Sequence, residues 1–81
     1  MNITYKFMAV AKCPKADMLD FYDCQFTTEQ MIECETIAET VLSLSSKTLF
    51  QEELAAVLSE AFGGVAVEVK GVHSGITVVA I

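Results

Sequence analysis

The sequence holds few side chains of the types that metal binding or nucleophilic catalysis requires: Cys13, Cys24, Cys34 and one histidine, His73. Protein zinc sites usually take their ligands from close pairs such as C-x2-C, and these residues form no such pair. A nucleophilic thiol needs a base beside it, whereas His73 falls in a turn-like stretch, Val72–Gly75. The spacing therefore predicts three free, inert thiols, with no metal site and no catalytic site.

The glycine pattern does not indicate a phosphate-binding loop either. Gly63-Gly64 follows a helical pattern, so it cannot present the free amides of a helix start to a phosphate. The pair is typical of a helix stop. We therefore expect no NAD, ATP, flavin or other cofactor, and a protein that is not an enzyme.

The most unusual feature is a segment of one charge sign between Asp17 and Glu39. It has seven acidic residues and no lysine or arginine, while all five lysines lie in its flanks. The acidic residues are Asp17, Asp20, Asp23, Glu29, Glu33, Glu35 and Glu39. Any single glutamate of this kind is simply solvated, but a helix usually gains stability from lysines one turn away from its glutamates. The missing lysines indicate that the acidic surface has a function of its own.

Composition restricts the domain count and the partners. A chain of 81 residues has room for one hydrophobic core, so we expect a single domain, residues 1–81. The net charge of −6 and the absence of arginine disfavour direct contact with nucleic acid or an anionic membrane, which needs clustered positive charge. An odd number of cysteines, with no leader-like or membrane-spanning apolar stretch, is typical of a cytoplasmic protein.

Four stretches have strand patterns. Residues 2–12 alternate between two faces, one of them clearly apolar. Residues 18–26 are interpreted as a second strand in a hairpin with the first, with an irregular edge strand or a short helical turn as alternatives. Residues 65–70 and 76–81 predict a C-terminal hairpin. Because the last strand is apolar on both faces, we expect it to be central in the sheet or covered on both sides.

Two segments carry helix signals. Thr27-x-x-Gln30 has the pattern of a capping box, which predicts that a helix begins at Thr27. The glutamates and Ile32 then lie on the polar side of this helix. Thr48-x-x-Gln51 repeats the signal, and the second helix is expected to end at Gly63-Gly64.

These elements predict an α+β fold. It is a two-layer sandwich in which a mainly antiparallel sheet carries both helices on one face, in the order β-(β)-α-α-β-β. Two helices joined by so short a link pack side by side. The other face of the sheet has no expected cover within this chain.

The leading hypothesis is a small acidic interaction protein that docks its acidic helix face on a basic, nucleic-acid-binding surface of a partner protein. Charge would steer the association, and Ile32 would supply an apolar anchor. The expected partner-binding residues are Asp20, Asp23, Glu29, Ile32, Glu33, Glu35 and Glu39. In size, charge and lack of motifs the chain resembles phage-encoded inhibitors of host nucleases, including anti-CRISPR proteins.

The alternative is a homo-oligomeric structural or accessory module. Its copies, two in the simplest case, would pair through an apolar sheet face. The expected interface residues are Met8, Val10, Val79 and Ile81. The two hypotheses are compatible, because the acidic helix and the open sheet face are different surfaces.

Overall fold

The first two strands form one long antiparallel hairpin. β1 (Ile3–Lys12) and β2 (Leu19–Thr28) have 10 residues each and pair along their whole length, from Ile3 opposite Thr28 to Lys12 opposite Leu19. Alternate side chains point to the same face, and the apolar set of each strand faces the helices. The pairing confirms the hairpin predicted for residues 18–26.

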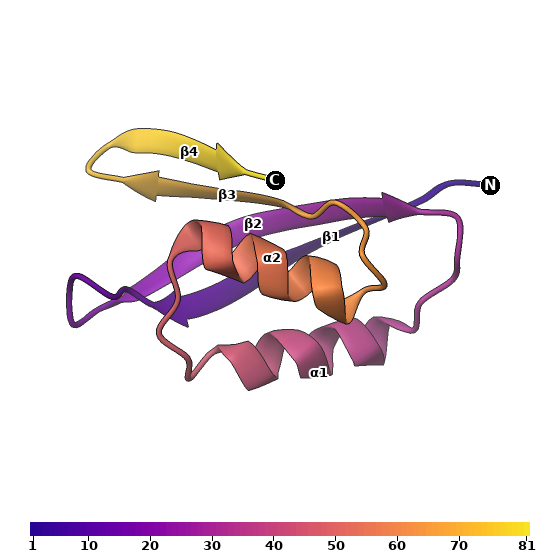
Figure 1. Cartoon of the computed structure of the whole chain (residues 1–81), viewed down its shortest axis with the longest axis horizontal. Helices are drawn as coiled ribbons and strands as arrows, with labels where there is room; N and C mark the ends of the chain where they lie inside the picture. The colour runs from indigo at the N-terminus through magenta and orange to yellow at the C-terminus, as the bar shows by residue number, and fades with distance from the viewer.

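The computed structural model, which describes residues 1–81, continues with two helices and a second hairpin (Figure 1). α1 spans Cys34–Leu44 and α2 spans Gln51–Ala61, and β3 (Glu68–His73) and β4 (Ile76–Ala80) follow. The four strands are antiparallel in the order β1-β2-β3-β4, and both helices lie on one face. The structure therefore confirms the predicted α+β sandwich.

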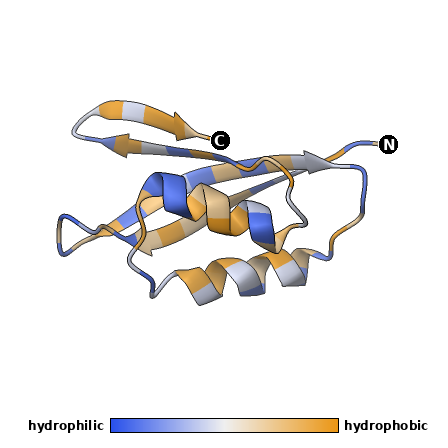
Figure 2. Ribbon diagram, in the orientation of Figure 1, coloured by the Kyte–Doolittle hydropathy of each residue, from blue (hydrophilic) through white to orange (hydrophobic).

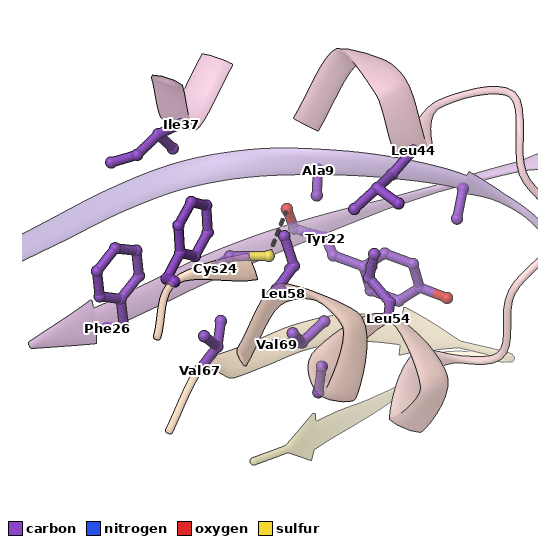
Figure 3. Packing of buried hydrophobic residues seen from close by; sticks show 13 residues of the cluster. Ala9, Tyr22, Cys24, Phe26, Ile37, Leu44, Leu54, Leu58, Val67 and Val69 are labelled. Carbon is purple, nitrogen blue, oxygen red and sulfur yellow. Dashed lines mark hydrogen bonds between the residues drawn. The ribbon is translucent and has the colours of Figure 1, made fainter. Parts of the chain in front are cut away.

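The core lies between the helices and the sheet, and Figure 3 shows how its side chains meet. α1 lies over β1, whereas α2 lies over β3 and β4. Leu54 and Leu58 of α2 are fully buried. The ring of Phe26 on β2 stacks on that of Phe62, just after α2, with centroids 4.8 Å apart. α1 buries only two residues, so α2 is the helix that holds the two layers together.

The prediction that the first helix begins at Thr27 is wrong. Thr27 belongs to β2, where it pairs with Thr4, and the two hydroxyls hydrogen-bond at 2.8 Å. The backbone ladder of a long hairpin contributes more than one side-chain cap, so the strand continues through the capping-box pattern. α1 begins at Cys34 instead, and Glu29 and Ile32 precede the helix.

The second helix also begins later than its capping-box pattern predicts. Thr48 forms a parallel bridge with Lys12, whose backbone exchanges hydrogen bonds of 3.0 and 3.1 Å with the link between the helices. This contact keeps the link extended, so α2 begins at Gln51. The Phe50 N–H donates to the Glu53 carboxylate at 2.9 Å, which satisfies one amide of the helix start. The link is thereby attached to the end of β1.

β4 lies at an edge of the sheet, and the expectation of a central or covered strand is wrong. It pairs only with β3, and Ala80 is its only residue that is not exposed. Figure 2 shows most of its ribbon in the orange of hydrophobic residues. An apolar edge strand with free backbone groups is a surface that another chain can cover. The apolar residues on both faces of β4 are therefore exposed on the surface of this chain instead of buried in its core.

Neither helix has both the length and the apolar character needed to cross a bilayer. The expected cytoplasmic location stays a prediction.

Replacing Leu54 tests the packing of α2. Leu54→Ala should lower the free energy of unfolding by roughly 2–5 kcal/mol, because the side chain is fully buried and its loss leaves a cavity. Val57 lies on the same helix and is 37% exposed, so Val57→Ala should cost under about 1 kcal/mol. Urea unfolding followed by circular dichroism measures both. A loss below about 1 kcal/mol for Leu54→Ala would contradict the packing of α2 on the sheet.

Candidate functional site

Three loops gather at one end of the sheet, the left end in Figure 1. They are the turn between β1 and β2, the link before α2, and the hairpin between β3 and β4. The antiparallel order brings the end of β1, the start of β2 and the end of β3 to this same end. Polar side chains from distant parts of the sequence therefore lie near one another here.

Six of these side chains carry titratable or amide groups, and we call them the end cluster. The end cluster consists of Cys13, Asp20, Tyr22, Gln51, Glu52 and His73. Its centre is Tyr22, whose hydroxyl hydrogen-bonds Asp20 and lies within electrostatic range of Cys13 and Glu52. The Tyr22 ring also lies 5.9 Å from the His73 ring, centroid to centroid.

Tyr22 is a neutral hydrogen-bond donor to Asp20. Its hydroxyl lies 3.3 Å from Asp20 Oδ2, which is long for such a bond. Burial raises the pKa of Tyr22 to about 12, and the negative charge of Asp20 adds to the effect. The phenol therefore stays protonated at neutral pH and orients the Asp20 carboxylate.

The position of the Tyr22 ring depends on Gly71. A Cβ atom at Gly71 would lie 2.5 Å from Tyr22 Cδ1, far inside van der Waals contact, so the ring occupies the space that a side chain would fill. The pairing of β2 with β3 ends nearby, at Asp23 opposite Lys70. Beyond this last pair a depression of about 310 Å³ opens between the two strands. Its lining is mostly exposed side chains of the face away from the helices, and of the end cluster only Asp20 contributes to it.

Gln51 is a buried member of the end cluster and connects α2 with the C-terminal hairpin. Its Nε2 donates to the carbonyl oxygens of Val69 and Val78 at 2.8 and 2.7 Å, and its Oε1 lies 3.0 Å from His73 Nε2. Because Gln51 is only 6% exposed, these bonds satisfy an amide whose burial would otherwise be costly. His73 is thus half-buried and held by α2, and it is the last residue of β3 instead of part of the turn that the sequence predicted.

The three cysteines are free thiols in different surroundings. Cys24 is buried, and burial raises its pKa to about 12, so it stays a thiol at neutral pH. Cys34 is exposed at the start of α1. Cys13 is partly buried just after β1, within electrostatic range of the Tyr22 hydroxyl. Of the three, Cys13 is the thiol that lies among polar groups.

The end cluster combines a thiol, a carboxylate and an imidazole, the groups that nucleophilic catalysis with acid–base assistance uses. Sequence reasoning placed Asp20 on a docking surface and Cys13 among the inert thiols. The predicted hairpin could have shown that Cys13 and Asp20 lie close together, because each is next in sequence to a member of the pair Lys12–Leu19 that closes the turn. The contact of Gln51 with His73 had no local signal, because the two residues are 22 positions apart.

The acidic residues expected to form one binding face are distributed over three parts of the structure. These are the sheet (Asp20, Asp23), the loop before α1 (Glu29), and α1 with its N-cap (Glu33, Glu35, Glu39). Ile32, the expected anchor, is half-buried against the core, and its N–H donates to the Tyr5 hydroxyl at 2.8 Å. The tertiary structure therefore does not assemble the single helix face that the sequence pattern predicted.

The residues expected at an interface between copies lie near the two outer strands of the sheet. Met8 and Val10 are on β1, Val79 is on β4, and Ile81 follows β4. Met8, Val10 and Val79 lie on the face away from the helices, because their neighbours on the other face are buried or paired with buried residues. They form two separate patches, since β2 and β3 lie between them. Pairing of copies stays a prediction.

A small α+β domain with a thiol, a carboxylate and an imidazole at one end of its sheet has the groups of an enzyme site. A solved structure described as the archaeosine synthase QueF-Like in the apo form has this fold: it superimposes with a TM-score of 0.83 at 20% sequence identity, over 98% of this chain and 88% of that chain. No family model matches the sequence, and comparison with curated proteins finds no significant match. At 20% identity the likeness shows the fold alone.

This likeness contradicts the hypothesis of an anti-CRISPR-type inhibitor. The chain has the fold of a protein named as a synthase, and neither its structure nor the comparisons support an inhibitory or phage-encoded role. One reason for that hypothesis was the lack of catalytic groups in the sequence. The end cluster weakens this reason, because it brings several polar and titratable side chains to one end of the sheet.

A double-mutant cycle tests the fit between Tyr22 and Gly71. Gly71→Ala should lower the free energy of unfolding by about 1–3 kcal/mol, because the new methyl group overlaps a buried ring. In a Tyr22→Leu background the same change should cost clearly less, since the ring is gone. Urea unfolding of the four proteins gives the coupling energy. Equal costs of Gly71→Ala in both backgrounds would contradict the contact.

Sedimentation equilibrium tests the pairing of copies. If copies pair through the outer strands, the mass at micromolar concentration should exceed that of the 8.8 kDa chain. Val79→Lys should then restore the monomer, because it places a charge on the exposed apolar edge. Glu60→Lys, on the exposed side of α2, is the matched control and should leave the mass unchanged. A strict monomer for the unaltered chain would refute the pairing.

Proposed function

We propose that this chain is an enzyme that uses Cys13 as its nucleophile on a small heterocyclic substrate, a free nucleobase or nucleoside. The observation that carries the proposal is the place of Cys13 at the end of the sheet where Tyr22 hydrogen-bonds Asp20 and lies beside His73, with Cys13 within electrostatic range of the Tyr22 hydroxyl. The fold shared with the archaeosine synthase QueF-Like supports a substrate of the nucleobase type, since archaeosine is a modified nucleoside.

Three groups of the end cluster have roles in the proposed reaction: Cys13, Asp20 and Tyr22. The Cys13 sulfur forms a bond to an electrophilic carbon of the substrate, and the thiol proton passes to the Asp20 carboxylate. The same proton is then returned from Asp20 to the substrate heteroatom that receives the electron pair. Tyr22 keeps Asp20 oriented through its hydrogen bond of 3.3 Å. Burial excludes Cys24 from this role, because its thiol stays protonated.

Charge favours a small substrate over an intact nucleic acid. The chain has a net charge of −6 and no arginine, so a phosphate backbone would be repelled along most of its surface. A base or nucleoside avoids this repulsion because it carries no phosphate.

Trapping the covalent intermediate tests the proposal. The protein is incubated with a panel of bases and nucleosides that carry a nitrile or aldehyde on the ring, and the intact mass is measured. The expected result is an adduct of one ligand per chain that Cys13→Ala abolishes. Cys34→Ala is the control and should leave the adduct unchanged, because that thiol is exposed and lies on α1. Adducts that persist in Cys13→Ala, or no adduct across the panel, would refute the proposal.

Replacing Asp20 tests the acid–base role separately. Asp20→Asn should slow adduct formation by about 100-fold or more, because the amide cannot take up the thiol proton. Glu29→Gln is the control, since Glu29 is exposed and follows the other end of β2. An unchanged rate in Asp20→Asn would remove Asp20 from the mechanism.

A further inference from the structure

We infer that Gln51 holds His73 with its proton on Nε2, so that His73 takes up and releases protons only at Nδ1, and that Gln51 is thereby the positioning residue of the end cluster. The part that concerns proton transfer rests on the proposed function. The part that concerns the protonated nitrogen rests on hydrogen-bond geometry alone.

The first step is the orientation of the Gln51 amide. Its nitrogen has two hydrogens, and both are used, by the carbonyl oxygens of Val69 and Val78 at 2.8 and 2.7 Å. Rotating the amide by half a turn would place Oε1 against these two acceptors. The two carbonyls therefore decide that Oε1 is the atom facing His73.

The second step is the proton on the imidazole. Gln51 Oε1 can only accept, and it lies 3.0 Å from His73 Nε2, so Nε2 must donate and carry the hydrogen. A neutral imidazole has one N–H, which leaves Nδ1 unprotonated. A charged imidazole has both, so it too keeps Nε2–H. Every proton that His73 gains or loses while this contact holds therefore moves at Nδ1.

The third step is the surroundings of the ring. His73 is half-buried beside Tyr22, with the ring centroids 5.9 Å apart, and Tyr22 is hydrogen-bonded to Asp20. The other ionisable groups near this pair are Cys13 and Glu52, which lie within electrostatic range of the Tyr22 hydroxyl. Nδ1 has no hydrogen-bond partner within the chain, whereas Nε2 has one. Nδ1 is thus the imidazole nitrogen available to a substrate N–H.

The three hydrogen bonds of Gln51 explain why a glutamine occupies this buried position. A leucine or methionine could fill the space, but neither could bond two carbonyls and an imidazole at once. Glutamate could accept from Nε2 but could not donate to the two carbonyls. Tautomer control and structural bracing are therefore separable by mutation.

Nitrogen NMR of the single histidine tests the inference without any substrate. In the full chain labelled with 15N-histidine, every ring signal belongs to His73, and long-range proton correlations identify the protonated nitrogen. At a pH where the ring is neutral, the expected spectrum has Nε2 protonated and Nδ1 unprotonated. Gln51→Met should convert it to a mixture of tautomers. Gln51→Glu should keep Nε2–H although both donor bonds are lost, a result that a merely structural role would not give.

The control is Glu53→Gln, two residues further along the same helix, because the Glu53 side chain accepts a hydrogen bond from Phe50 N–H and makes none with His73. It should leave the tautomer unchanged. A neutral His73 with its proton on Nδ1, a mixture in the unaltered chain, or an unchanged tautomer in Gln51→Met would each overturn the inference. Adduct formation at Cys13 is measured separately, so a failure of the proposed function would appear there and leave the NMR result intact.

Discussion

The pairing of β1 with β2 over 10 residues is the constraint on which the rest of the structure depends. It extends β2 through a pattern that would otherwise start a helix, and it moves the start of α1 to Cys34. It also leaves Lys12 at the end of β1, where its backbone holds the link before α2. The register of the first hairpin therefore determines where α2 starts, and so where Gln51 lies, although the hairpin is distant from α2 in the sequence.

The end cluster is ordered because its buried polar groups are satisfied. No buried side-chain nitrogen or oxygen in the chain lacks a hydrogen-bond partner. Gln51 joins three backbone or side-chain groups, and Tyr22 fits against a glycine that leaves room for its ring. In a low-dielectric environment a satisfied network of this kind has one favoured arrangement, because each alternative leaves a donor or acceptor without a partner. Geometry of this kind is what acid–base chemistry requires.

The acidic composition is compatible with an enzyme once the substrate is small. Most of the carboxylates are exposed and spread over strands, loop and helix, so they act on approaching molecules as a general negative field. Such a field opposes phosphate-rich partners and has little effect on a neutral base. The sequence predicted that Glu29, Glu33, Glu35 and Glu39 share one helix face. Only Glu35 and Glu39 lie within α1, and most of the segment from Asp17 to Glu39 is strand and loop.

Local patterns in the sequence determined the number, type and order of the elements, because alternation and helical periodicity are properties of neighbouring residues. The sequence also predicted that the thiols are free and that both helices lie on one face of the sheet. Only the tertiary structure decided where α1 begins, that the apolar β4 lies at an edge, and that Cys13, Asp20 and His73 share one end of the sheet. These features depend on strand register and on contacts between residues that are distant in sequence, such as Gln51 with His73, for which no local pattern exists.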